Sequence, residues 1–446
     1  MRVLSHYRSN VTTRSLLFLL VALLIFAVAV LYRAATEGLE MGTQLERSTV
    51  TNVPARTRVA TIEQLQTRIE RNPDDVAAYA TLGLALLQQV RERNDVTLYA
   101  RAGQALDAAL QRDPHQVDAL TGKGVLALAL HDFSGALQWA GKILAVNPFR
   151  AAAYGIRTDA LVELGRYPDA VNAVQQMVNL RPDVESYSRV SYLRELHGDM
   201  EGAIEAMRMA AESAVPGSEP WLWTITHLGH LYWNRGELDE AARIYGQALS
   251  LRADYPYAQA GLARVYAAQG ETQRARDLLV PLTQRLPLPE FLILLGELYQ
   301  ASGDMPQARA QYDLVGVIQQ LNSAAGMNVD LELATFAVNH GADAATALQQ
   351  AQAAYAARPT IYAADTLAWA FYRAGRLDEA LEYSRVALNL GTQDAFIYYH
   401  AGMIARATGD DATAADYLRK AAAINPHFSL LETDALEEAL ATLAEP

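Results

Sequence analysis

The chain has 446 residues, of which 51% are hydrophobic and 20% are charged, so it holds ample apolar material for a continuous folded core. Its formal net charge at pH 7 is −13 and its basic residues are nearly all arginine, which argues against a body that binds nucleic acid. There is no cysteine, so disulfides, thiolate metal sites and a cysteine nucleophile are excluded.

A long apolar stretch lies close to the amino terminus. The seventeen residues from Leu16 to Tyr32 carry no charge, and they follow three arginines. At about 1.5 Å per helical residue this stretch spans roughly 25 Å, near the short limit for crossing a bilayer. We therefore predict a transmembrane signal-anchor helix over residues 15–33 of a single-pass protein of the cell membrane. The bias of basic residues places residues 1–14 in the cytoplasm and the remaining chain outside it.

A cleaved signal peptide is the alternative interpretation of the same stretch. Ala27-Val28-Ala29 has the small-x-small form of a cleavage site, in which case the mature protein is secreted. The apolar run continues through Tyr32, which favours an uncleaved anchor. Under either interpretation the body of the chain is exported. Residues 34–60 are polar and are predicted to form a flexible linker.

Glycines recur at nearly regular intervals through the remaining chain. They stand at positions 165, 198, 236, 270, 303, 341, 375 and 409, which gives steps of 33 to 38 residues. Each glycine ends one helical pattern, as in the segment YWNRG before Glu237, and an alanine-rich pattern begins a few residues later. A period of this length is typical of a solenoid of helical hairpins, and not of separate globular domains.

The repeat resembles the tetratricopeptide repeat, whose pattern is a bulky residue, Leu-Gly and an aromatic residue, followed by Ala, an aromatic residue, Ala and Pro. The fifth unit has these residue types at Ile225, Leu228-Gly229, Tyr232, Gly236, Ala241, Tyr245 and Ala248. Ten such units begin near residues 76, 117, 151, 184, 222, 256, 289, 327, 361 and 395, and they cover about four-fifths of the chain. The resemblance implies an all-α, right-handed superhelical solenoid of about ten helical hairpins.

The predicted solenoid occupies residues 61–428, and it opens with a short helix at Thr61–Arg71. Residues 429–446 are predicted to form a capping helix, because the ends of a solenoid otherwise expose core. The first unit has about seven extra residues between its helices, which lengthens that hairpin. Two insertions, VPGSE before Pro220 and LNSAAG before Met327, are expected to kink the stack.

Stacked hairpins form a concave groove from the first helix of each unit. In the family that the repeat resembles, this groove binds peptides or extended segments of partner proteins. The positions that face it hold aromatic residues and arginines in two patches, which give large contact area, cation–π contacts and partners for carboxylates. The predicted groove residues are Tyr192, Trp223, His230, Trp233, Asn234, Tyr257, Arg264, Tyr362, Trp369, Tyr372, Arg373, Phe396, Tyr399 and Arg406. The alternative is that these side chains pack against neighbouring helices.

Catalytic and metal chemistry find little support in the sequence. His227 and His230 could share a metal ion only with a third ligand, and no carboxylate lies one turn away on their helix, so no metal site is expected. Acidic pairs such as Asp239-Glu240 stand where second helices begin, and they are interpreted as capping features. No stretch outside the repeats is long enough for a catalytic domain. We therefore expect neither an enzyme nor a cofactor.

These observations predict a membrane-tethered, extracytoplasmic scaffold that binds proteins or extended peptides through its concave groove. The chain resembles the membrane-anchored tetratricopeptide proteins of bacterial envelopes, and this resemblance implies a role in envelope protein assembly, biogenesis or transport. The alternative is a non-catalytic accessory subunit of a membrane enzyme or transporter complex. Expected partners are protein or peptide ligands, with the membrane reached through the N-terminal helix and without nucleic acid.

Overall fold

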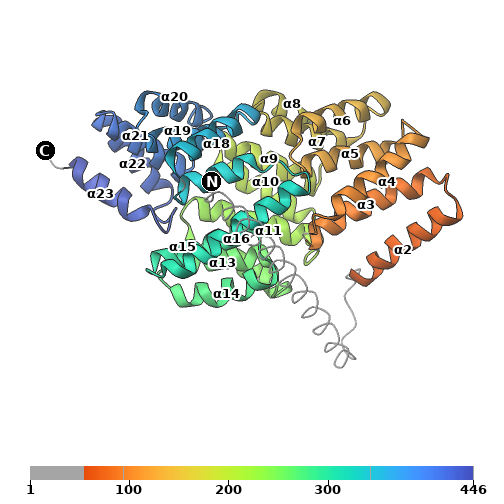
Figure 1. The fold of residues 1–446 in the computed structure, drawn as a ribbon, viewed down its shortest axis with the longest axis horizontal. Helices are drawn as coiled ribbons and strands as arrows, with labels where there is room; N and C mark the ends of the chain where they lie inside the picture. The colour runs from red at the N-terminus through yellow and green to blue at the C-terminus, as the bar shows by residue number, and fades with distance from the viewer. Residues whose placement is uncertain (1–54, 94, 342, 445–446) are drawn as a thin grey trace, which may run out of the picture. The chain divides into compact units, whose positions relative to one another are not determined.

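A computed structural model of the chain describes residues 55–93, 95–341 and 343–444. Within these residues every regular element is an α-helix, which confirms the predicted all-helical fold (Figure 1). The predicted cytoplasmic segment, the signal-anchor helix and most of the linker fall in residues 1–54, outside the described part. None of the helices in the described part is long and apolar enough to cross a membrane.

The described chain forms ten consecutive helical hairpins, each made of a first and a second helix. The first helices are α3 (Val76–Arg93), α5 (Val117–Ala129), α7 (Ala151–Glu163), α9 (Val184–Leu196), α11 (Glu219–Asn234), α13 (Pro256–Ala268), α15 (Pro289–Ala301), α17 (Asp330–Asn339), α19 (Ile361–Arg373) and α21 (Ala395–Ala407). The second helices are α4 (Leu98–Arg112), α6 (Phe133–Val146), α8 (Tyr167–Leu180), α10 (Met200–Glu212), α12 (Leu238–Leu251), α14 (Thr272–Arg285), α16 (Met305–Ala324), α18 (Ala344–Ala357), α20 (Leu377–Ala387) and α22 (Asp411–Ile424). Helix α2 (Ala55–Arg71) precedes the hairpins, and α23 (Thr433–Ala444) follows them.

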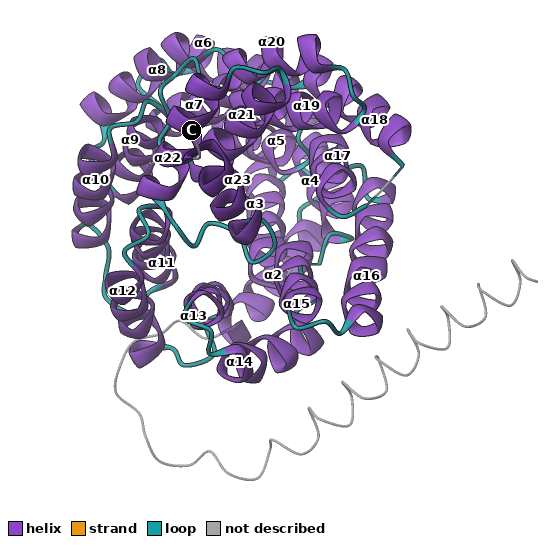
Figure 2. Cartoon of the chain, turned by 90° about the vertical axis from the view of Figure 1, so that its left-hand side faces the viewer, coloured by secondary structure: helices purple, strands orange, loops and turns teal. Residues whose placement is uncertain are grey.

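The hairpins form two layers around a common axis. Figure 2 shows second helices such as α8, α12 and α16 on the outer rim, whereas first helices such as α7, α11 and α15 lie inside them. Each first helix therefore turns one face toward its own second helix and another toward the interior of the superhelix. This arrangement makes the first helices the source of the inner surface.

The packing of neighbouring hairpins explains the small residues of the repeat. The ring of Tyr245 on α12 lies against the backbone of both Gly229 on α11 and Gly261 on α13. A Cβ added at these glycines would come within 2.4 and 2.5 Å of ring atoms, well inside van der Waals contact. One aromatic side chain thus fills the space among three helices only because two of them carry glycine.

Helix α16 takes up most of the second insertion. The LNSAAG insertion is predicted to kink the stack, and its first four residues continue α16, which is 20 residues long and ends at Ala324. Leu, Asn, Ser and Ala can all be accommodated in a helix, and the stop comes from Gly326, which takes a φ of +89°. The insertion therefore lengthens a second helix instead of forming a loop there.

Successive turns of the superhelix touch each other. Hydrogen bonds join residues that are 192 to 198 positions apart, so each of the second to fifth hairpins meets the segment six hairpins later. The backbone N–H of Asn328 donates to the Leu130 carbonyl at 3.0 Å, and that of Ile361 donates to the Tyr167 hydroxyl at 2.9 Å. The Thr392 hydroxyl donates to the Leu196 carbonyl, and the Asn425 side-chain amide donates to the Trp233 carbonyl at 2.8 Å. Apolar side chains from both turns, including Leu161, Leu196 and Ile361, share one buried cluster at this junction.

Two turn glycines are required by this junction as well as by their own hairpins. Gly165 and Gly198 have φ angles of +68° and +76°, which side chains other than glycine rarely adopt. A Cβ at either position would also lie 2.3 Å from a carbonyl oxygen of the other turn, that of Pro359 or Gly391. The glycines therefore end a helix and admit a second backbone at the same point.

Arg358 is the main ionic contact between the turns. Its guanidinium lies 2.5 Å from Glu163 on α7 and 2.9 Å from Glu332 on α17, and it faces the ring of Phe133 at 4.9 Å. The residue is 8% exposed, and the two carboxylates outweigh its burial and raise its pKa. One buried cation thus joins the third hairpin to the eighth.

Replacing Arg358 with alanine should leave Glu163 and Glu332 close together without their common cation. We expect a loss of about 2 kcal/mol in the free energy of unfolding, because removing one partner of a largely buried ion pair leaves the other charge without compensation. Urea denaturation of the full chain would measure this loss. The matched control is Arg376→Ala, whose side chain is 48% exposed and pairs with Glu379, so it should cost about 0.5 kcal/mol or less. Equal losses in the two variants would contradict a special role for Arg358.

Candidate functional site

The first aromatic cluster lies on α11 and explains the dense group of tryptophans and histidines there. The ring of Trp223 stacks on His227, with centroids 3.7 Å apart, and His227 meets the edge of His230 at 5.4 Å. His230 Nδ1 is 2.7 Å from the hydroxyl of Tyr245, the residue that fills the space between α11 and α13. The row of rings therefore runs from the half-buried Trp223 into the core of the hairpin.

Burial keeps both histidines of this cluster neutral near pH 7. It lowers the pKa of His227 and lowers that of His230 well below its usual value, and nearby His227 and Arg264 add to the effect at His230. Among the described residues, no group of three histidine, aspartate or glutamate side chains is arranged to hold a metal ion. The pair thus acts as packing and hydrogen-bonding groups in this structure.

The second aromatic cluster lies on α19 and α21. Trp369 is stacked between Tyr372, at 4.5 Å, and His400, at 4.2 Å, with all three rings nearly parallel. His400 Nδ1 is 2.9 Å from a carboxylate oxygen of Asp365. Tyr399 packs on Phe428, and its hydroxyl donates a hydrogen bond of 2.7 Å to Glu432 in the segment before α23. This cluster holds the last hairpin to the terminal segment.

The stacking of the two turns brings α9 close to the beginnings of α19 and α21. Asn234 at the end of α11 donates a 2.8 Å hydrogen bond to Glu195 on α9. Glu195 is in turn within electrostatic range of Asp394, the N-cap of α21, and of Tyr362 on α19. We call Tyr192, Glu195, Tyr362 and Asp394 the junction residues. They come from the fourth, ninth and tenth hairpins, so residues far apart along the chain meet here.

The junction residues carry negative charge in a poorly hydrated place. Burial raises the pKa of Glu195 to about 7; the hydrogen bond from Asn234 opposes this rise, and the charge of Asp394 adds to it. Burial and the neighbouring Asp365 also raise the pKa of Asp394. Burial raises the pKa of Tyr362 well above its usual value. The shifts of both carboxylates mean that an added positive charge would be favourable here.

The predicted groove residues divide into exposed and packed groups. Tyr192, Tyr257 and Phe396 keep 39, 36 and 37% of their surface exposed on first helices. Trp233, Trp369 and Tyr399 are 5, 8 and 1% exposed and belong to the packed core. The remaining residues make contacts within the protein or are half-buried. Trp223 and Tyr372 stack on other rings, and His230 and Asn234 make hydrogen bonds. Arg264 lies over Trp233 at 5.6 Å, Arg373 donates to the Val338 carbonyl, and Tyr362 and Arg406 are half-buried. Their roles in binding remain predictions.

Two acidic residues of the junction were missed by the sequence analysis. Glu195 stands at a groove position of its repeat, so the register of the fourth hairpin could have identified it. Asp394 precedes a first helix and accepts hydrogen bonds from the backbone of Phe396 and Ile397, which gives it the sequence signature of an ordinary N-cap. Its second role depends on a neighbour from the other turn, which no local pattern reveals.

A small hollow lies beside the junction. It has a volume of about 190 Å³ and is lined by Thr158, Asp159, Val162, Glu163, Arg189, Tyr192 and Leu193. Arg189 donates two hydrogen bonds, of 2.8 and 2.6 Å, to Asp159, so the basic group in the hollow is already paired. The volume is below the roughly 300–1,000 Å³ of small-molecule sites, and it suits a single side chain of a peptide.

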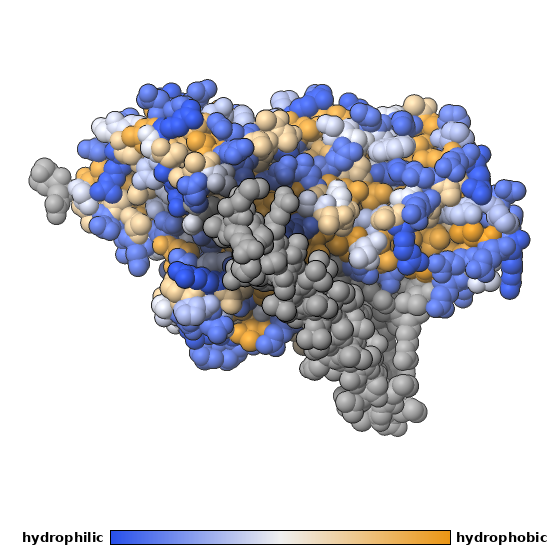
Figure 3. Space-filling view, in the orientation of Figure 1, coloured by the Kyte–Doolittle hydropathy of each residue, from blue (hydrophilic) through white to orange (hydrophobic). Residues whose placement is uncertain are grey.

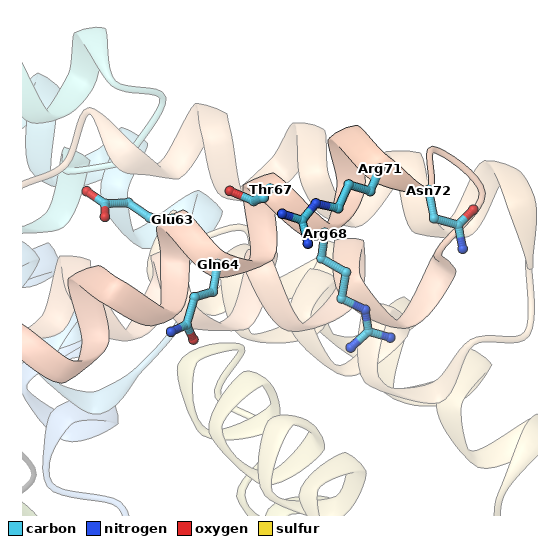
Figure 4. A pocket seen from close by; sticks show the side chains of 6 residues that line it. All are labelled: Glu63, Gln64, Thr67, Arg68, Arg71 and Asn72. Atoms are coloured by element: carbon cyan, nitrogen blue, oxygen red, sulfur yellow. The ribbon is translucent and has the colours of Figure 1, made fainter.

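A second hollow lies at the amino-terminal end of the stack. The described residues that line it are Glu63, Gln64, Thr67, Arg68, Arg71 and Asn72 (Figure 4). All of them belong to α2 or directly follow it, and no second described helix adds a converging polar group. The junction, to which several helices contribute, is therefore the better candidate site. On the face drawn in Figure 3, apolar residues form patches among hydrophilic ones.

The arrangement at the junction suits recognition and not bond-making chemistry. Tyr192 is exposed, whereas Glu195, Tyr362 and Asp394 are half-buried. Asp159, Glu163 and Asp365 are each held by a nearby cation or histidine. Tyrosine supplies contact area and a hydroxyl donor at low entropic cost. An extended segment that carries a basic side chain could pair with Glu195 or Asp394 while it lies on Tyr192.

Comparisons with known proteins identify the repeat. Sequence models described as "Tetratricopeptide repeat" match residues 95–155, 157–219, 232–290, 366–394 and 397–428, together more than half of the chain. "Tetratricopeptide repeat protein 13" of Homo sapiens is 26% identical over 174 residues, which are 38% of this chain and 20% of that protein. "Cellulose synthase 1 operon protein C" of Komagataeibacter xylinus is 26% identical over 197 residues, which are 44% of this chain and 13% of that protein. The matched segments thus span a fifth or less of these two relatives.

Among solved structures, the human IFIT1 dimer with m7Gppp-AAAA has a TM-score of 0.48 and 14% identity, over 74% of this chain and 76% of that one. The tandem helical hairpins, the glycine and aromatic positions that pack them, and the five matched segments lead to one conclusion. This chain belongs to the tetratricopeptide repeat family, whose stacked hairpins are scaffolds for protein–protein interaction.

Proposed function

We propose that this chain is a membrane-tethered scaffold outside the cytoplasm that holds an extended, basic segment of a partner protein against its inner surface. The process served would be the assembly, biogenesis or transport of envelope proteins. The observation that carries the proposal is the junction, where Glu195 lies within electrostatic range of both Asp394 and the exposed Tyr192. The membrane tether rests on the apolar stretch from Leu16 to Tyr32 and on the basic residues that precede it.

The charge at the junction supports a basic ligand. Both carboxylates have raised pKa values, so their ionised forms are destabilised in the unbound protein. An arginine or lysine side chain placed between them would remove this cost and gain charge-assisted hydrogen bonds. The net charge of −13 would also speed the approach of a cationic segment and slow that of an acidic one.

The aromatic side chains support an extended ligand. Tyr192, Tyr257 and Phe396 are exposed on three different first helices, and the fold does not bury them as it buries Trp369. A segment that crosses several hairpins can reach such separated contacts, whereas a compact small molecule cannot. The inner surface thus favours a peptide that makes several weak contacts over a single deep anchor.

Peptide binding tests this proposal directly. The full chain in detergent should bind a fluorescein-labelled twelve-residue peptide of arginine, leucine and serine, and should not bind the same peptide with glutamate in place of arginine. The variant Tyr192→Ala/Glu195→Gln should weaken binding of the basic peptide about tenfold or more, since about 1.4 kcal/mol changes the affinity tenfold. Fluorescence anisotropy would provide both measurements.

A matched control separates the junction from the general acidity of the chain. Phe149→Ala/Glu205→Gln removes one aromatic ring and one carboxylate at positions that are 76 and 74% exposed, away from the junction. It should leave binding unchanged. Equal binding of the acidic and basic peptides, or equal weakening by the two double variants, would refute the proposal. Isolation of the chain in a fixed stoichiometric complex with one membrane protein would instead favour an accessory subunit.

The raised pKa of Glu195 also predicts how stability depends on pH. Its pKa is about 7 in the folded protein and 4.5 in the reference state, so between these values the folded state holds a proton that the unfolded state has released. The contribution of Glu195 to the free energy of unfolding should therefore fall as pH rises from about 4.5 to about 7, and stay level above that. Glu195→Gln should remove this decline and be more stable than the wild type at pH 8, by urea denaturation. A Gln variant that is less stable at pH 8 would contradict the assigned shift.

The tether and its orientation can be tested with a single cysteine, because the natural chain has none. Phe149→Cys places a thiol on the exposed loop between α6 and α7. In intact cells a membrane-impermeant maleimide should label this thiol, and the labelled chain should remain with the membranes after a high-salt wash. Labelling only after cell lysis would refute the extracytoplasmic location. Labelled protein found only in the medium would indicate a cleaved signal peptide.

A further inference from the structure

Helix α16 carries an apolar stripe that the fold does not use. Leu314, Val317 and Leu321 are 45, 52 and 60% exposed, and they occur on consecutive turns. Ala310 and Ala324 extend the stripe by one position at each end, and both are exposed. Among the described second helices, only α16 exposes three large apolar side chains on consecutive turns. Such a stripe on a soluble surface indicates an interaction site.

The stripe is opposite the face of α16 that packs in its own hairpin. Ala308, Val315 and Gln319 are the buried residues of α16. At 100° per residue, their mean direction differs by about 145° from that of Leu314, Val317 and Leu321. Figure 2 shows α16 on the outer rim, with its partner helix α15 on the inside. One helix therefore has two apolar faces, of which one is satisfied within the hairpin.

The spacing of the stripe is that of a helix-pairing seam. Its five positions are separated by 4, 3, 4 and 3 residues, which is the a and d pattern of a heptad repeat. The residue types read Ala, Leu, Val, Leu, Ala, and this order is the same from either end. A two-fold symmetric interface requires a surface that is complementary to itself, and this order provides one about Val317.

We propose that a second copy of this chain occupies the stripe, with the two α16 helices antiparallel about a two-fold axis at Val317. Val317 then meets its own copy, each Ala310 lies opposite an Ala324, and each Leu314 lies within one residue of the level of a Leu321. The alanines at the ends allow the helices to approach closely, while the leucines fill the seam.

The charge distribution favours a second copy as the occupant. With a net charge of −13, two copies repel each other over most of their surfaces. The stretch from Leu314 to Asn328 has no charged residue, so the stripe is a place where like chains can meet without placing carboxylates together. It also offers no ionic partner to a highly charged peptide.

The residues that flank the seam select the antiparallel orientation. With Leu314 and Leu321 at a positions, Asp313 and Gln320 occupy g positions and Ile318 an e position. In an antiparallel pair the g positions face each other, so Asp313 lies beside Gln320 and the two Ile318 side chains meet near the axis. A parallel pair would place the carboxylate of Asp313 beside Ile318, an unfavourable contact.

Cysteine cross-linking tests the proposal on the full chain in detergent. Since the natural sequence has no cysteine, Val317→Cys introduces the only thiol. Mild oxidation should join most of this variant into a covalent dimer through the two-fold axis. The matched control Leu251→Cys, at a position 56% exposed on another second helix, should remain mostly monomeric. A Val317→Cys variant that stays monomeric, or equal cross-linking of the two variants, would overturn the proposal.

Sedimentation of unmodified protein gives an independent test. The seam has two heptads and is short, so the wild type should show a reversible monomer–dimer equilibrium in the micromolar range. Leu314→Glu/Leu321→Glu should lower the dimer association constant by about a hundredfold or more, while circular dichroism shows unchanged helicity. Leu251→Glu should leave it as in the wild type. A wild type that is monomeric at all concentrations up to about 100 μM would refute self-pairing.

Discussion

The contact between successive turns of the superhelix is the constraint on which the rest of this structure depends. In most solenoids each repeat touches only its neighbours, so stability is a sum of local terms. Here hydrogen bonds connect residues 192 to 198 positions apart, and apolar side chains of both turns share one cluster. The rotations between successive hairpins must therefore add up to the value that places the sixth one in contact with the first. A change in the packing of one hairpin would disturb the contacts between the turns.

This constraint explains local features that the hairpins alone do not require. The turn of the second hairpin has His131 with a φ of +58° where later hairpins have glycine. Its Nδ1 is 2.7 Å from the carbonyl of Asn328, whose own N–H donates to the Leu130 carbonyl. A contact from the next turn thus compensates for a residue that is unfavourable in this conformation. At Gly165 the same kind of turn admits the Pro359 carbonyl because no side chain is present.

The sequence was sufficient for the fold and for only part of the candidate site. The period of the glycines and the alternation of bulky and small residues set the hairpins, because these depend on contacts between adjacent helices. The groove positions follow from the same register, so Tyr192, Tyr257 and Phe396 could be placed on the inner surface. The junction could not be predicted, since the position of one turn on the next depends on small rotations summed over six hairpins. Trp369 has a groove position by register, yet His400 of the adjacent hairpin stacks on it and encloses it against Tyr372.

The two proposed binding surfaces belong to opposite layers, which has a consequence for how they could act together. The junction is built from first helices and opens to the interior, whereas the stripe of α16 lies on the rim (Figure 2). Pairing through α16 would therefore leave both inner surfaces accessible, and the dimer would present two of them with a fixed geometry. A partner with two basic segments would then bind the second segment at a high effective concentration, so that weak contacts at each junction give firm attachment. Since the described residues beside the junction enclose only a small hollow of about 190 Å³, such pairing would be the physical source of its affinity.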